Sequence, residues 1–145
     1  MEKGLELSAK SGSPVENKSD FRKLVGSLIY LTATRPDLSY AMRYISCFMA
    51  APTIDHWATT RRILRHVNGT LDFGILYGRT KEPRLIGYTN SDLAGSVDDK
   101  KSTFGYVFSL GIGVVTWTSK KQQVVTLSST EVEYRGTVKV TCEAV

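Results

Sequence analysis

The side chains that most often perform covalent or metal chemistry are few in this chain and lie far apart. The cysteines, Cys47 and Cys142, form no CxxC pair and have no histidine nearby in sequence, so we expect two buried thiols rather than a disulfide framework or a zinc site. The histidines, His56 and His66, have no acid or serine arranged with them for nucleophilic catalysis. Gly111-Ile112-Gly113 is interpreted as a hairpin turn, because a GxG alone does not define a phosphate loop. Carboxylates and basic side chains remain as candidates.

Three helices are expected in the first half of the chain. Residues 1–19 are polar and predict a flexible leader. A helix begins near Ser19 or Asp20, either of which can cap it, and residues 35–37 (Arg-Pro-Asp) break it and open a second helix. A third helix opens at Thr53 and is expected to end at residues 68–69 (Asn-Gly) in a left-handed cap. The apolar positions of the three helices are Leu24, Leu28 and Leu31; Leu38, Ala41, Met42, Ile45, Phe48 and Met49; and Ile54, Trp57, Ala58, Leu64 and Val67.

After residue 78 the pattern changes to strands. Residues 84–89, 103–110 and 114–119 have strand character, and the last two flank the 111–113 turn as a hairpin. Residues 123–127 are a candidate for a further short strand. Ser128 and Glu131 predict a capping box for a final helix that runs to the end of the sequence. The expected class is α+β, with a leader at 1–19, a helical segment at 20–78 and a β-β-β-α segment at 79–145.

Positive charge is concentrated between Asp20 and Arg84. This stretch carries the whole of the net charge of +5. Such a segment is compatible with phosphate contacts and, more simply, with solvated helix faces. The sequence holds no apolar run long enough for a secretory signal or a transmembrane helix, so a cytoplasmic protein without membrane association is expected.

Several blocks of the sequence together form a recognisable pattern over about residues 20 to 145. They are Phe21-Arg-Lys-Leu-Val-Gly-Ser-Leu-Ile-Tyr30, Thr34-Arg-Pro-Asp-Leu-Ser-Tyr-Ala41, His56-Trp57, Arg62-Ile-Leu-Arg65 with Gly69-Thr70, Gly87-Tyr-Thr-Asn-Ser-Asp-Leu-Ala-Gly95, Asp99-Lys-Lys-Ser-Thr103, Trp117-Thr-Ser-Lys-Lys-Gln122 and Leu127-Ser-Ser-Thr-Glu-Val-Glu-Tyr134. These blocks resemble the end of copia-type retrotransposon Pol polyproteins. They occur in the family's order and with its gaps, which makes the match far more specific than any single block.

This resemblance implies a fold and a chemistry. In the family, the helical part joins reverse transcriptase to ribonuclease H, and the β-β-β-α part opens the ribonuclease H fold. Two-metal hydrolysis of RNA needs about four carboxylates that converge on a pair of Mg²⁺ ions. The family's first-strand aspartate falls on Asn90, whose neutral amide does not replace a carboxylate, and its helix glutamate falls on Glu133. The remaining ligand positions would lie beyond Val145. We therefore expect no nuclease activity, no bound metal and no cofactor.

Asp92 is the one carboxylate near Asn90 that could compensate. It lies two residues further along the strand, which displaces it by roughly 7 Å and is too far for a metal site that needs sub-ångström placement. Asp92 is interpreted instead as a polar residue at the end of a strand. Leu93 and Ser96 stand where the family usually has Trp and Asp, which indicates a segment released from its original constraint.

The resemblance also implies that the ribonuclease H-like part is truncated. In the complete sheet the first strand is central and pairs with a fourth strand. Without that strand, one edge of residues 84–89 is unpaired, and the fragment is expected to be loosely folded, self-associating or completed by a partner.

A second resemblance is local. The residues Arg62, Ile63, Leu64 and Arg65 spell RxLR, the tetrapeptide of oomycete effectors that are secreted, enter plant host cells and often suppress host cell death. Some secreted RxLR effector proteins look like copia fragments of this size. The alternative is that both arginines are simply the solvent face of the third helix, because the retroelement pattern itself often ends this helix as R-x-L-R. No Glu-Glu-Arg follows the tetrapeptide.

Three interpretations of function remain open. The first is a non-catalytic retroelement remnant. The second is a secreted effector that acts in the host cell by binding a host protein. The third is a remnant that binds nucleic acid weakly and without sequence specificity, through its basic helices.

Overall fold

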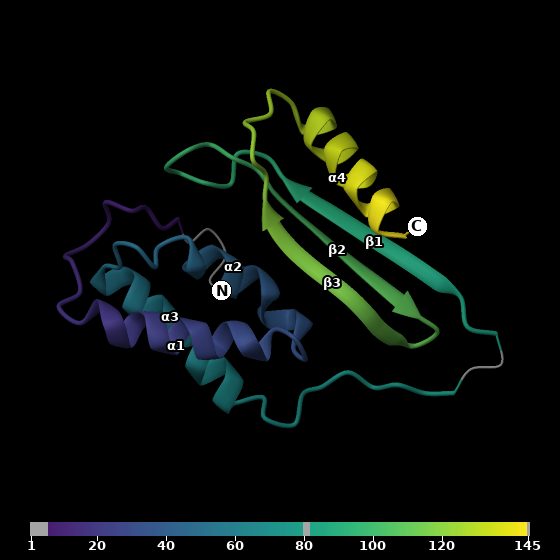
Figure 1. The fold of residues 1–145 in the computed structure, drawn as a ribbon, viewed down its shortest axis with the longest axis horizontal. Coiled ribbons are helices and arrows are strands. Elements are labelled where there is room, and N and C mark those ends of the chain that lie inside the picture. The colour runs from purple at the N-terminus through teal and green to yellow at the C-terminus, as the bar shows by residue number, and fades with distance from the viewer. Residues whose placement is uncertain (1–5, 80–81, 145) are drawn as a thin grey trace. The chain divides into compact units, whose positions relative to one another are not determined.

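The first described element, helix α1, begins at Lys18 because Asn17 caps it, its side-chain oxygen accepting the Asp20 N–H at 3.2 Å. We examined a computed structural model, which describes residues 6–79 and 82–144. The elements are α1 (Lys18–Leu31), the 3₁₀ helix η1 (Pro36–Leu38), α2 (Ser39–Ser46), α3 (Ile54–Asn68), β1 (Leu85–Asp92), β2 (Thr103–Leu110), β3 (Gly113–Lys121) and α4 (Ser129–Ala144). Helices precede three strands and a final helix, as expected for the α+β class (Figure 1). The predicted caps at Ser19 and Asp20 are wrong.

The chain divides into two compact units between Gly74 and Ile75. The first unit is helical and holds its own apolar core. Its fully buried side chains come from every helix of the unit: Phe21, Val25 and Leu28 of α1, Leu38 of η1, Met42 and Ile45 of α2, and Ile63 of α3. The helical spacing predicted for the second helix is confirmed by this burial, since it places Leu38, Met42 and Ile45 on one side.

The apolar face predicted for the third helix is wrong in part. Ile54 is 57% exposed and Leu64 is 37% exposed, whereas His56, Thr59 and Thr60 are buried. The threonines tolerate burial because each hydroxyl donates to the carbonyl one turn earlier, Thr59 to Asp55 at 3.0 Å and Thr60 to His56 at 2.8 Å. Polar groups that are satisfied inside their own helix can therefore line a core.

The two ends of α3 differ from each other in how well the sequence predicted them. Thr53 caps the start as expected, in a reciprocal box in which the His56 ring accepts the Thr53 N–H at 3.0 Å. The other end does not have the predicted left-handed cap, because Gly69 is right-handed with φ of −81°. The Gly69 N–H instead continues the helical pattern by donating to the Arg65 carbonyl at 2.9 Å.

The expected flexible leader is wrong for its described residues. Leu7 is only 4% exposed and belongs to the helical core, and its N–H donates to the Tyr44 hydroxyl at 2.9 Å. Pro14 forms a β-bridge with Thr53, and the Val15 N–H donates to the Pro52 carbonyl at 3.1 Å. This segment is therefore part of the first unit, while residues 1–5 lie outside the described residues.

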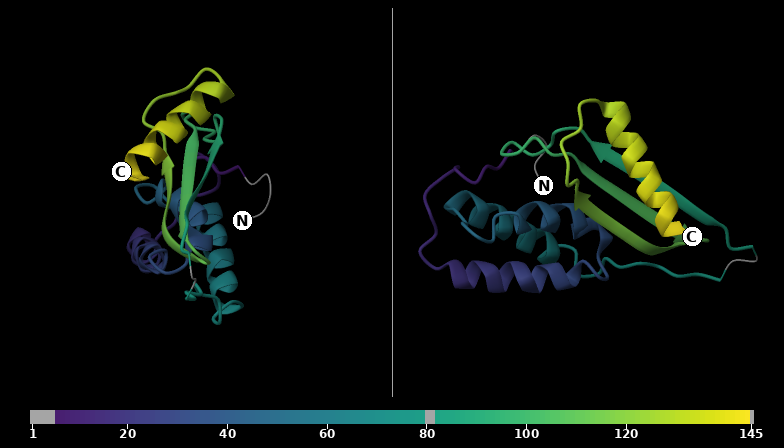
Figure 2. Two further views of the ribbon diagram at one scale, coloured as in Figure 1. Left: turned by 90° about the vertical axis from the view of Figure 1, so that its right-hand side faces the viewer. Right: turned by 45° about the horizontal axis from the view of Figure 1, so that its top comes forward.

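The second unit is an antiparallel sheet in the order β1-β2-β3 with one helix on it. α4 lies across one face, chiefly over β1 (Figure 2). Phe104, Tyr106 and Phe108 alternate along β2 and are buried under it, as period-two spacing requires. The β2–β3 hairpin turns at Gly111, whose φ of 62° suits glycine. Among the described residues no further strand pairs with the outer edge of β1 or of β3.

The candidate strand at 123–127 does not form. β3 ends at Lys121, and Val124, Val125 and Leu127 are 46%, 51% and 94% exposed. The β-branched character of Val124 and Val125 does not produce a strand, because no neighbouring strand pairs with this segment. The segment is held instead by buried Thr126, whose hydroxyl bonds that of Ser102 at 3.0 Å.

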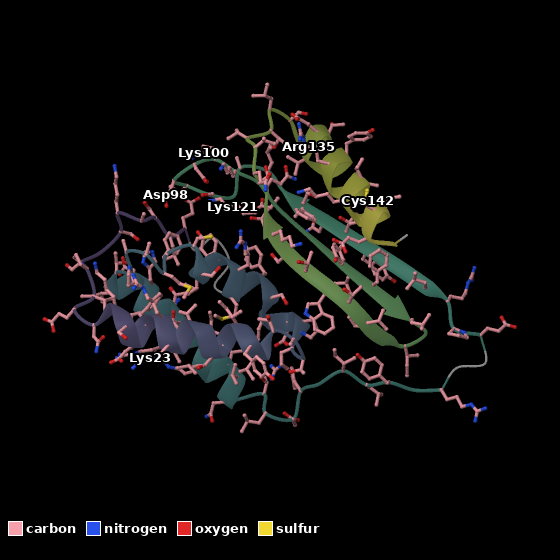
Figure 3. The ribbon with its side chains drawn as sticks, in the orientation of Figure 1. Lys23, Asp98, Lys100, Lys121, Arg135 and Cys142 are labelled. Carbon is pink, nitrogen blue, oxygen red and sulfur yellow. The ribbon has the colours of Figure 1, made fainter. Side chains whose placement is uncertain are left out.

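The structure also describes the cysteines and the apolarity of the helices. Cys47 and Cys142 are both free and exposed, so the prediction of two buried thiols is wrong; Figure 3 shows Cys142 on the surface of α4. Among the described helices, none combines the length and apolarity needed to cross a membrane.

Candidate functional site

The positions where the family resemblance implies metal ligands, and the nearby Asp92, lie near the end of β1 and in the first turns of α4. Thr89 and Ser91 face the helix: the Ser91 hydroxyl donates to the Val132 carbonyl at 3.5 Å, and Gly136 of α4 packs directly against both side chains. Because neighbouring residues of a strand alternate between faces, Asn90 points to the opposite side of the sheet. Asn90 is exposed there and pairs with Gly105 in the ladder.

Asp92 is the final residue of β1, at the start of a tight turn. A Cβ atom at Gly95 would overlap the Asp92 carboxylate, so the missing side chain of Gly95 makes room for it. Ala94 adopts a left-handed conformation with φ of 53°, and its N–H donates to the Ser102 hydroxyl at 3.1 Å. This geometry agrees with the interpretation of Asp92 as a strand-end residue.

Glu133 of α4 is exposed. Val132 and Gly136 of the same helix are buried against the sheet. The carboxylate of Glu131 is the one that is engaged: it accepts the Leu127 N–H at 3.1 Å and a hydrogen bond from Arg135 at 2.9 Å. The Ser128 hydroxyl accepts the Glu131 N–H at 3.2 Å, so half of the predicted capping box forms and the other half reaches Leu127. Among the described residues, no three His, Cys, Asp or Glu side chains gather closely enough to hold a metal ion.

The block at residues 99–103 has a structural explanation. Lys121 of β3, labelled in Figure 3, donates to the Asp99 carboxylate at 2.7 Å and to the Ser96 hydroxyl at 2.8 Å. Burial alone would raise the pKa of Asp99, but hydrogen bonds from Lys121 and Ser96 and from the Lys101 backbone lower that pKa to about 2. Asp99 therefore stays ionised and ties its loop to the end of β3.

The RxLR-like tetrapeptide lies in the last turns of α3. Arg62 and Arg65 are exposed, as predicted for the solvent face of the helix, while Ile63 is 5% exposed and belongs to the core. The side chain of Leu64 is exposed, at 37%. The structure therefore presents two arginines on a folded helix and not an extended four-residue segment.

One polar cluster was missed by the sequence analysis. Arg35, at 8% exposure, donates to both oxygens of Asp37 at 2.9 and 2.8 Å, and the same carboxylate is 3.0 Å from the His66 ring. The expectation that His66 has no acid partner is therefore wrong. Hydrogen bonds with Arg35, which has the larger effect, and with His66 lower the pKa of Asp37 to about 2, although burial alone would raise that pKa. The Arg-Pro-Asp spacing was the available signal for the first pair, but His66 comes from a distant helix.

Comparison with known proteins places this chain among retroelement-derived sequences. The retrovirus-related Pol polyprotein from transposon RE2 of Arabidopsis thaliana is 44% identical over 138 residues, which are 95% of this chain and 10% of the polyprotein. The Pol polyprotein from transposon TNT 1-94 of Nicotiana tabacum is 40% identical over 137 residues, again 10% of its own length. This chain thus spans about a tenth of the Pol polyproteins that it matches.

A shorter relative matches over most of its own length. The secreted RxLR effector protein 161 of Plasmopara viticola is 43% identical over 122 residues, which are 83% of this chain and 86% of that protein. No family model matches the chain, and no solved structure matches it. The chain belongs to the copia-type family of retrovirus-related Pol sequences.

Proposed function

We propose that this chain is a non-catalytic segment of the copia-type Pol family, whose second unit is a ribonuclease H-like module without nuclease activity. The observation that carries the proposal is Asn90, an amide at the position where the family resemblance implies the first-strand metal ligand. An amide is neutral and weakens the negative field that two Mg²⁺ ions require.

The surroundings of Asn90 support the same proposal. Asp92 has its carboxylate against Gly95, in the turn that follows β1. Thr89 and Ser91, not Asn90, face α4, the helix that carries Glu133. Loss of the first-strand carboxylate weakens the binding of metal ions whichever other ligands a longer chain would supply.

The test is hydrolysis of an RNA–DNA hybrid by the purified chain in Mg²⁺, with Glu133→Gln and Asp92→Asn as matched controls. Both substituted carboxylates are exposed, so the variants are expected to keep the fold, which circular dichroism checks. We expect no Mg²⁺-dependent cleavage by the unmodified chain above the level of either variant. Cleavage that disappears in either variant would prove the chain to be a nuclease and would refute the proposal, whereas cleavage equal in all three identifies a contaminating enzyme.

A second candidate function is favoured by one comparison and one surface. The relative named as a secreted RxLR effector is covered over 86% of its length, and Arg62 and Arg65 are both exposed on α3. In this alternative the chain is a secreted effector that enters plant host cells and suppresses host cell death by binding a host protein. Because Ile63 is buried, the arginines would act as a pair on the folded helix and not as an extended tag.

The effector alternative is tested in plant cells that express the chain and are challenged with a cell-death elicitor. The double variant Arg62→Ala, Arg65→Ala is compared with Arg43→Ala, an exposed arginine on α2. Suppression that is lost in the double variant and kept in Arg43→Ala supports the effector. Absence of suppression by the unmodified chain, or equal suppression by the double variant, rules this role of the arginine pair out.

A further inference from the structure

The outer edge of β1 presents a row of free backbone groups. The Gly111 N–H donates to the Arg84 carbonyl at 3.1 Å, so these two residues extend the β1–β2 ladder by one hydrogen-bonded pair. Because hydrogen-bonded and non-hydrogen-bonded pairs alternate in an antiparallel ladder, the even-numbered residues of β1 bond to β2. The odd-numbered residues direct their N–H and C=O groups to the outer edge, where no strand among the described residues receives them. These residues are Leu85, Gly87, Thr89 and Ser91.

The two edges of the sheet differ in how they are protected against a further strand. At the β3 edge, the Tyr77 hydroxyl donates to the Val114 carbonyl at 2.8 Å, an extra residue shifts the register, and the strand ends in Lys121. Bulges, lysines and covering segments are devices that block strand addition. β1 keeps one register over its whole length and holds no proline and no charged residue before Asp92. Its edge is therefore open to another strand.

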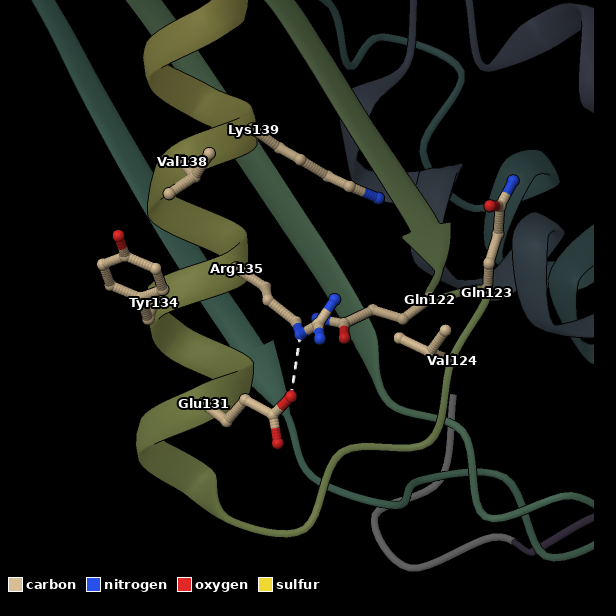
Figure 4. A pocket seen from close by; sticks show the side chains of 8 residues that line it. All are labelled: Gln122, Gln123, Val124, Glu131, Tyr134, Arg135, Val138 and Lys139. Carbon is tan, nitrogen blue, oxygen red and sulfur yellow. Dashed lines mark hydrogen bonds and ion pairs between the residues drawn. The ribbon is translucent and has the colours of Figure 1, made fainter.

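α4 covers a face of β1 but leaves this edge free. Gly136 packs against Ser91 of β1 and also against Phe104 of β2. Lys139 lies over the ring of Phe104 at 4.7 Å, so the helix leans toward β2. The flank of α4 that carries Lys139 borders a pocket of about 470 Å³ beside residues 122–124, which follow β3 (Figure 4). These contacts place the helix toward the interior of the sheet.

We propose that a second copy of this chain pairs with β1, so that two antiparallel β1 strands join two three-stranded sheets into one. The two copies are related by a two-fold axis at Tyr88, which makes the interface self-complementary. Leu85 then meets Ser91 of the second copy. Gly87 likewise meets Thr89, so every outward N–H and C=O group of β1 finds a partner. Backbone hydrogen bonds supply the affinity when a strand is added to a sheet edge.

The charges at the ends of β1 favour this register. Arg84 directly precedes the strand, Asp92 ends it, and both are exposed. The axis at Tyr88 sets Arg84 of each copy opposite Asp92 of the other, and opposite charges across two strands stabilise their pairing. An axis at Gly87 would instead set Glu82 opposite Asp92, and like charges in this position are destabilising. Tyr88 is 63% exposed in the single chain, and at the axis its ring packs against the same ring of the second copy.

Sedimentation velocity of the full chain over a range of concentrations tests the proposal, and we expect a dimer that dissociates on dilution. Tyr88→Lys sets two like charges together at the axis and should raise the Kd of the dimer at least about tenfold. Arg84→Asp should also raise this Kd, whereas Arg79→Asp, at an exposed arginine outside β1, makes the same change in net charge and should leave it unaltered. Circular dichroism checks that each variant is folded. A monomer at every concentration, or a dimer unaffected by Tyr88→Lys, would refute the proposal.

Disulfide formation tests the register itself. Cys47 and Cys142 are exposed, so both are first replaced by serine. In that background, oxidised Tyr88→Cys should yield a covalent dimer, because Cα atoms directly opposite in a non-hydrogen-bonded pair are about 4.5 Å apart and a disulfide spans that distance. Ile86→Cys is the matched control, since in this register it faces Asn90 and the two introduced thiols lie about 13 Å apart. Equal crosslinking of the two variants, or none by Tyr88→Cys, would show that the axis is not at Tyr88.

Discussion

At the scale of single residues, Arg35 shows how a charge is kept inside the helical unit. Its guanidinium is held by both oxygens of Asp37, and by the carbonyl and hydroxyl of Thr70 at 2.9 and 2.7 Å. The ring of Phe73 lies 5.7 Å from the guanidinium carbon. Because a buried charge is costly without partners, these contacts make Asp37 the acid on which the unit most depends.

Asp37→Asn is expected to destabilise the protein by about 1 kcal/mol at pH 7, because Arg35 keeps its charge and loses an ionised partner that is partly screened by solvent. Urea unfolding followed by circular dichroism measures this change. Glu16→Gln, at an exposed acid, serves as the control and is expected to have almost no effect. Equal stability of Asp37→Asn and Glu16→Gln would show that the pair contributes nothing.

The same carboxylate gives the stability of the protein a dependence on acid. The pKa of Asp37 in the folded state, about 2, lies below its value in an unfolded chain, so its contribution is complete at pH values above about 4 and disappears as the pH falls from about 4 to 2. The side chain is 36% exposed, so screening limits the contribution to about 1 kcal/mol. Asp99, with a pKa also lowered to about 2, titrates in the same window. Asp37→Asn should therefore flatten the acid limb of the unfolding free energy measured from pH 5 to 2.

At the scale of elements, the contact between α4 and β1 depends on a glycine. A Cβ at Gly136 would lie 2.7 Å from the Ser91 hydroxyl oxygen and 3.6 Å from that of Thr89. The helix can approach the strand this closely only because position 136 has no side chain. Glycine lowers helix stability by about 1 kcal/mol relative to alanine, and the close packing of α4 on β1 offsets this cost.

Gly136→Ala is expected to destabilise the protein by about 1 kcal/mol, since the overlap with Ser91 outweighs the gain in helix propensity. In a Ser91→Ala background the obstructing oxygen is absent, and the same substitution is expected to become stabilising. The two backgrounds are compared by thermal unfolding of the four proteins in a double-mutant cycle. A stabilising Gly136→Ala in the original background would disprove the close approach.

Local signals in the sequence predicted the elements well where pattern and turn chemistry agree. The second helix followed from its apolar spacing, and the hairpin followed from the turn at Gly111. The errors at Leu7 and His66 concern residues whose environment is set by distant parts of the chain. Leu7 is buried by Tyr44 and its neighbours, and His66 is paired with Asp37, so neither could be read from nearby sequence.

At the scale of the whole molecule, the two units have separate cores. The first core is built from Leu7 and the helices up to α3, and the second from β2 residues under α4. A core of its own is the usual requirement for folding alone.

Residues 1–74 are therefore expected to fold without the second unit. A protein of these residues should show a helical circular dichroism spectrum and a single cooperative unfolding transition. The control is the same protein with Met42→Ala, which removes a side chain that is 1% exposed and should lower the free energy of unfolding by about 2–5 kcal/mol. A gradual, non-cooperative loss of helix would contradict the expectation.

The insertion of Leu7 has a consequence for synthesis. This side chain precedes every helix of its unit in the sequence, yet the core that encloses it includes Ile63 of α3. At about 5–20 residues per second, several seconds pass between the synthesis of Leu7 and that of α3, and Leu7 is uncovered during this time. Completion of the helical unit during translation is thus timed by the arrival of α3 and not by the early formation of α1.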